Sequence, residues 1–75
     1  MNLLLEERLQ DMKVEILSAV EHHPRFLRSE RVPLGSMLRI FKTLTPHSED
    51  SFQFLVTPDR DPGQVVQDIL EYLEG

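Results

Sequence analysis

Residues 3–23 read LLLEERLQDMKVEILSAVEHH, the longest stretch of helical periodicity in the chain. Its apolar residues recur at spacings of four, three, four and three, which places them on one stripe of a helix. This seven-residue repeat also suits lengthwise packing against another helix. We expect one helix over 3–23, and we expect the rest of the chain to cover its stripe or to leave part of it for a partner. The stripe consists of Leu5, Leu9, Met12, Ile16 and Ala19.

Shorter elements follow this helix. Apolar spacing predicts a second helix over 34–44, and the alternating side chains of 51–57 predict a strand. A third helix over 62–74 is indicated by Asp61 as its N-cap and Pro62 at its first position. We therefore expect a mainly α (α+β) fold with one short strand, 51–57, and three helices, 3–23, 34–44 and 62–74.

The predicted strand over 51–57 has no evident partner strand. A strand leaves backbone donors and acceptors unpaired unless a second strand lies beside it. Two short segments, 31–32 and 43–45, are the candidates within the chain. Otherwise the strand pairs with another molecule through its free edge.

Length and composition point to a single small domain, 1–75, with a thin core. The chain contains no cysteine, so disulfides cannot support that core. Association with another protein or a second copy is then one source of stability, and an ordinary small monomer is the alternative. No stretch approaches the roughly 20 apolar residues of a membrane span, and Leu3–Leu5 are followed at once by acids. We expect no membrane contact and a cytoplasmic, intracellular protein.

The net charge of −5 is unevenly distributed. Five of the eight cations lie within residues 25–42, between two acidic flanks. They either pair with those flanks inside the domain or are merely solvated, or they form a basic face for nucleic acid or an acidic partner. The overall acidity of the chain favours the first reading, in which the cations are paired or solvated. The five are Arg25, Arg28, Arg31, Arg39 and Lys42.

Catalytic patterns do not emerge from the sequence. Gly35-Ser36 lacks the Gly-x-Ser-x-Gly frame of a nucleophile elbow. His22 and His23 are adjacent, so on a helix they point about 100° apart and cannot chelate one ion together, and His47 has no second ligand at a suitable spacing. We expect no enzyme activity, no metal, no cofactor and no small-molecule substrate.

The segment VPLGSMLRIFKTLT, residues 32–45, resembles part of the La motif, a winged-helix variant that binds RNA ends. In that family a Val-Pro-Leu or Val-Pro-Ile sequence leads into a helix, and Phe26-Leu27 is similar to its upstream Phe-Leu. The resemblance implies a winged-helix-like order of elements. The family's RNA pocket uses aromatic residues on the preceding helix, and 3–23 contains none, so no binding residue is carried over.

These observations predict a non-enzymatic module for protein–protein interaction or regulation. It would act through the amphipathic N-terminal helix, by oligomerisation or by binding another protein. The alternative is a winged-helix-like domain that binds nucleic acid through the basic segment 25–42. The predicted partner-binding residues are Leu4, Leu5, Leu9, Met12 and Ile16.

Overall fold

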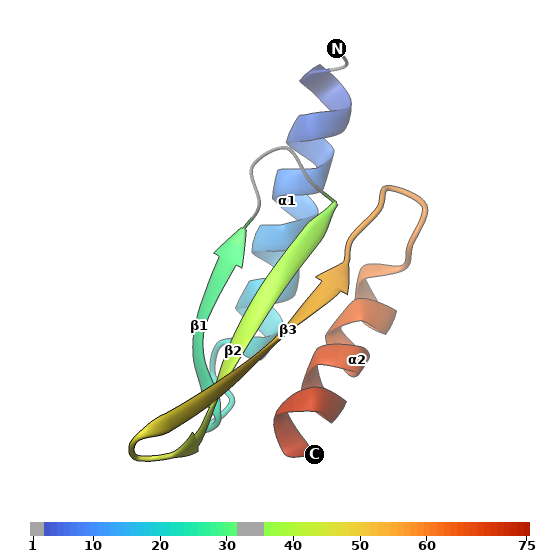
Figure 1. The fold of residues 1–75 in the computed structure, drawn as a ribbon. Helices are drawn as coiled ribbons and strands as arrows, with labels where there is room; N and C mark the ends of the chain where they lie inside the picture. The colour runs from blue at the N-terminus through green and yellow to red at the C-terminus, as the bar shows by residue number, and fades with distance from the viewer. Residues whose placement is uncertain (1–2, 32–35) are drawn as a thin grey trace.

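Two helices pack against a three-stranded antiparallel sheet in the computed structural model, which describes residues 3–31 and 36–75 (Figure 1). The strands follow one another along the chain and lie in the order β1-β2-β3, so the sheet is a meander. Both helices run in the same direction, from top to bottom of Figure 1. The elements are α1 (Leu3–Val20), β1 (Phe26–Arg31), β2 (Met37–Thr45), β3 (Ser48–Leu55) and α2 (Pro62–Glu74).

The prediction of three helices and one short strand is wrong. The segment expected to form the helix 34–44 supplies the central strand β2, with residues 34–35 outside the described part of the chain. The segment between the first two predicted helices contains β1. The expected strand 51–57 is β3, which starts and ends earlier and pairs with β2. The winged-helix-like order of elements and the helix that the La-motif resemblance implied are also wrong, because the order is α1-β1-β2-β3-α2.

The buried Lys42 explains why the pattern of apolar residues does not identify β2 as a strand. Leu38 and Ile40 point to the covered face of the sheet, and Lys42 continues the same row with only 6% of its surface exposed. A charged residue in an inward position hides the alternation that identifies a strand. The β-branched Ile40 and Thr43 nevertheless favour extended structure.

The first and last elements agree better with the sequence. α1 ends at Val20, three residues before the predicted His23. α2 covers the predicted range 62–74, and the Asp61 carboxylate accepts a hydrogen bond of 3.1 Å from the Gly63 N–H at its start. This is the N-cap geometry expected for an Asp that precedes a Pro.

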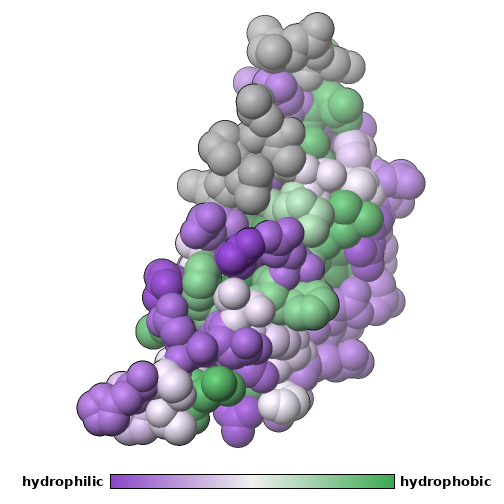
Figure 2. Space-filling view, in the orientation of Figure 1, coloured by the Kyte–Doolittle hydropathy of each residue, from purple (hydrophilic) through white to green (hydrophobic). Residues whose placement is uncertain are grey.

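The core lies between the helices and one face of the sheet, which we call the inner face. α1 supplies two of its residues, Ile16 and Val20, whereas Ala19 of the predicted stripe is exposed. The opposite face of the sheet, the open face, carries apolar and charged side chains side by side (Figure 2). The buried apolar residues are Ile16, Val20, Leu38, Ile40, Phe54, Val56, Val65, Ile69 and Leu73.

Candidate functional site

The predicted partner-binding residues of α1 divide into a buried and an exposed group. Ile16 is fully buried and Met12 packs against the core from the side, so both support the fold. Leu9 is half-buried. Leu5 is 39% exposed and Leu4 is 73% exposed, so the row of apolar residues continues past the core onto the surface. Apolar surface is visible over this part of α1 in Figure 2.

The difference in helix length accounts for this exposure. α1 has 18 residues and α2 has 13, which correspond to roughly 27 Å and roughly 20 Å. The buried residues of α1 all lie in its C-terminal half, beginning at Lys13. The N-terminal half therefore contributes little to the core and presents Leu4 and Leu5 to solvent. We define these two residues, with the half-buried Leu9, as the α1 tip.

Two of the five predicted basic-face residues bind the C-terminal end of α2. The Lys42 ammonium donates to the carbonyl oxygens of Tyr72 and Gly75, at 2.7 and 3.3 Å. The Arg25 guanidinium donates to those of Leu73 and Glu74, at 3.2 and 3.4 Å. Cations are favourable at this end of a helix, whose last carbonyl groups lack partners within the helix. These two side chains serve the fold.

A third cation, Arg28, is engaged on the open face. Its guanidinium forms a two-pronged ion pair with the Glu49 carboxylate, with distances of 2.9 and 2.8 Å, and lies 4.0 Å above the centre of the Phe41 ring. The hydrogen bonds from Arg28 lower the pKa of Glu49 below its ordinary value. Arg39 stands opposite Glu30 in the β1–β2 ladder, and the side chain of Arg31 lies outside the described residues.

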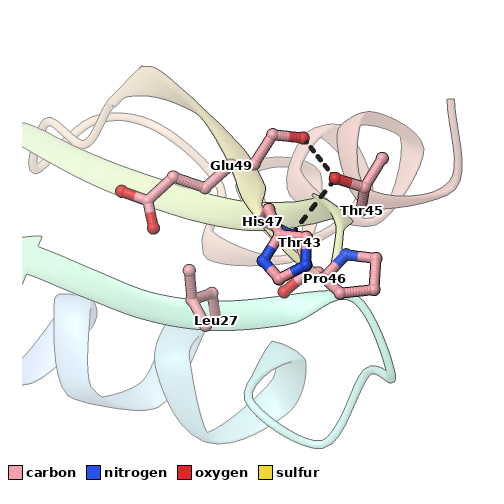
Figure 3. Close-up of a pocket in the computed structure, with 7 residues that line it drawn as sticks. Leu27, Thr43, Thr45, Pro46, His47 and Glu49 are labelled. Carbon is pink, nitrogen blue, oxygen red and sulfur yellow. Dashed lines mark hydrogen bonds between the residues drawn. The ribbon is translucent and has the colours of Figure 1, made fainter.

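A depression of about 360 Å³ lies at the turn between β2 and β3 (Figure 3). The hydroxyl groups of Thr45 and Ser48 hydrogen-bond each other at 2.8 Å, and the His47 backbone N–H donates to Thr45 at 3.3 Å. The carboxylate of Glu49 is held by Arg28. The hydroxyl groups of Thr45 and Ser48 and the Glu49 carboxylate thus have partners within the chain, and we assign the depression no ligand. Its lining residues are Leu27, Thr43, Thr45, Pro46, His47, Ser48 and Glu49.

Among residues 3–31 and 36–75, no three His, Asp or Glu side chains come together in a group that could hold a metal ion. His23 accepts a hydrogen bond from the Arg25 N–H through Nδ1, and its Nε2 lies 3.7 Å from a carboxylate oxygen of Glu74. His47 lies in the turn between β2 and β3. In the same part of the chain no helix has the length and apolar character needed to cross a membrane.

Sequence reasoning missed an aromatic cluster at the border between the sheet and α2. Phe52 is 57% exposed, and its ring centre lies 5.2 Å from that of Phe54 and 5.7 Å from that of Tyr72. The alternation of Phe52 and Phe54 signalled a common face. The position of Tyr72 depends on how α2 docks, for which the sequence offers no local signal.

No protein-family model, curated protein or solved structure matches this chain.

Proposed function

We propose that this chain is a non-enzymatic protein–protein interaction module that acts through the α1 tip. The observation that supports the proposal is that the row of apolar residues on α1 extends beyond the core, where Leu4 is 73% and Leu5 is 39% exposed. Apolar side chains gathered at the end of a helix gain free energy when a complementary apolar surface removes them from water. The partner is a protein with such a surface, either a second copy or a different chain, and the proposed setting is the cytoplasm.

The test replaces Leu5 by Glu and compares it with the same change at Val14. Val14 is 50% exposed and lies nine residues further along α1, on the opposite side of the helix. Leu5→Glu should abolish association because it puts a charge into an apolar contact, whereas Val14→Glu should preserve it. Circular dichroism checks that both variants keep their helices.

Association is followed in two ways. Sedimentation equilibrium at micromolar concentrations detects self-association. Cross-linking of a tagged chain in cells, followed by mass spectrometry, detects other proteins, and fractionation of the same cells tests the cytoplasmic setting. If neither method finds a partner that the wild type and Val14→Glu retain and Leu5→Glu loses, the proposed function is incorrect.

A further inference from the structure

The sheet has two edges, β1 and β3, and they differ in how well they are protected (Figure 1). The pairing of β1 with β2 is interrupted by a register shift between Phe26 and Arg28. The pairing of β3 with β2 also has a register shift, between Thr43 and Thr45, but it is regular from Asp50 to Leu55. β1 carries the charged residues Arg28, Glu30 and Arg31. The stretch Ser51–Leu55 reads SFQFL, with no charge, proline or glycine. Bulges, charges and proline are the usual means by which sheet edges avoid further pairing, so β3 is the receptive edge.

Two contacts show which backbone groups of β3 face away from β2. The Val56 N–H donates to the Ser36 carbonyl on the β2 side at 2.6 Å. Backbone groups alternate in direction along a strand, so Phe54 and Phe52 also face β2, while Gln53 and Ser51 face away from it. The Arg60 guanidinium donates to the Leu55 carbonyl at 3.2 Å, as an outward-facing group allows. In the described part of the chain no strand pairs with β3 on this side.

We propose that two copies of this chain pair through the outward edges of β3, antiparallel about a twofold axis at Phe52, and join their sheets into one. Ser51 of each copy then faces the partner's Gln53, and each such pair exchanges two main-chain hydrogen bonds. These bonds leave the Leu55 carbonyl with Arg60. The twofold axis closes the assembly, so no edge of β3 remains open for a third copy.

The exposed Phe52 fits this register. It lies on the axis, so it stands directly opposite the partner's Phe52 in a non-hydrogen-bonded pair, the type of pair with the closer side chains. Its ring already contacts Phe54 and Tyr72 on the inner face. The dimer would extend this aromatic cluster across the axis and remove from water a side chain that is 57% exposed in the single chain.

Charge complementarity favours a second copy as the occupant. Glu49 and Asp50 lie at the start of β3, where Arg28 pairs with Glu49 and the Tyr72 hydroxyl donates to Asp50. Arg60 lies against Leu55, the last residue of β3, and pairs with Asp68 at 3.2 Å. In the proposed register Glu49 faces the partner's Leu55, so the Arg28–Glu49 pair of each copy meets the partner's Arg60–Asp68 pair and the two ion pairs join in one network. The same contact recurs at the other end of the interface by symmetry. A parallel arrangement would instead place like charges together.

The test changes Phe52 to Lys and uses Leu44→Lys as the matched control. Leu44 is 56% exposed, like Phe52, but it belongs to the central strand β2. Sedimentation equilibrium should show that the wild type has twice the chain mass of 8.8 kDa. Phe52→Lys sets two ammonium groups opposite each other, so it should raise the dissociation constant at least about tenfold. Leu44→Lys should leave the constant unchanged within about twofold.

A second variant guards against misfolding of Phe52→Lys. Gln53→Pro removes an outward N–H that β2 does not use, and proline is tolerated at such edge positions. It should also prevent dimerisation while circular dichroism stays unchanged. In wild-type protein, hydrogen exchange of the Ser51 and Gln53 amides should slow as concentration rises.

The edge and the α1 tip can be separated experimentally. A wild type that stays monomeric, or a dimer that survives both Phe52→Lys and Gln53→Pro, overturns the edge proposal. So does a dimer that only Leu5→Glu disrupts, because self-association then belongs to the α1 tip. A dimer lost in the β3 variants and kept in Leu5→Glu supports the edge proposal, even if no protein is found that depends on Leu5.

Discussion

Tyr72 joins α2 to the sheet through its hydroxyl group and its ring. Its hydroxyl donates a hydrogen bond of 2.8 Å to the Asp50 carboxylate, and the Lys42 ammonium lies 4.3 Å from its ring centre. Burial of the phenol, followed by the hydrogen bond to Asp50, raises the pKa of Tyr72 above its ordinary value of 10.0. One side chain therefore reports on whether α2 is docked.

We predict that Tyr72 titrates at higher pH in the folded protein than in urea. Because the folded state holds this proton more tightly, the associated stability is fully present below the ordinary pKa and is lost as the pH rises through the folded-state pKa. Tyr72 is the only tyrosine, so ultraviolet absorbance of tyrosinate follows it alone. Asp50→Asn should lower the folded-state pKa in part, since burial remains. Equal titration in folded and unfolded protein would contradict the prediction.

At the scale of elements, the C-terminal end of α2 depends on cations from β2 and from the turn before β1. α2 has no basic residue in its last turn. Lys42 comes from β2, and Arg25 comes from the turn before β1. Because α1 and α2 run in the same direction, their negative ends lie at the same end of the molecule (Figure 1). These cations offset that arrangement.

We predict that Lys42→Met lowers the free energy of unfolding by about 2 kcal/mol, because charged hydrogen bonds to the helix end are lost. The control is Arg39→Met, which makes the same kind of change on the open face of the same strand and should alter stability by less than about 0.5 kcal/mol. Urea unfolding followed by circular dichroism measures both. Equal losses in the two variants would show that Lys42 has no special role.

The sequence predicted the elements whose signals are local. α2 was found from Asp61 and Pro62 at its start, and α1 from its apolar spacing. The apolar residues of β2 recur at helical spacing and therefore predict a helix, and the inward Lys42 breaks the alternation that would indicate a strand. The role of Lys42 becomes evident only from the docked position of α2. β1 was missed because Arg28 and Glu30 occupy one face and the polar Ser29 lies between them. Short sheets take their side-chain pattern from such distant contacts.

The candidate site was predictable to a similar extent. The length of the first helix predicted that its N-terminal leucines, Leu3, Leu4, Leu5 and Leu9, would be left outside the core. Leu4 and Leu5 are exposed and Leu9 is half-buried, while the side chain of Leu3 lies outside the described part of the chain. The fate of the cations could not be read from the chain, because Arg25 and Lys42 bind carbonyl groups from residues some thirty to fifty positions away. A count of charges along the sequence treats Arg25 and Lys42 as surface residues, whereas in the structure their side chains bind the C-terminal end of α2.

At the scale of the whole molecule, the chain is elongated, with extents of 42 × 20 × 16 Å. An elongated domain of this size has a thin core and correspondingly modest stability. Joining two sheets through β3 would add hydrogen bonds and bury Phe52 without changing the core. Stability should then depend on how much of the protein is dimeric.

We therefore predict that the midpoint of thermal unfolding rises with protein concentration in the wild type and in Leu44→Lys. Mass action stabilises a folded state that associates, and the effect disappears when association is prevented. Phe52→Lys should show a midpoint independent of concentration. Scanning calorimetry over a range of concentrations measures this. A constant midpoint in the wild type would count against a dimer that forms only from folded chains.

The order of the elements also has a consequence for synthesis. The inner face of the sheet is covered by the first and the last elements, and Val65, Ile69 and Leu73 of the core belong to α2. The core of a nascent chain therefore stays incomplete until α2 has left the ribosome. During that interval the apolar inner face and the receptive edge of β3 are exposed together, which is the condition under which chaperones engage a growing chain.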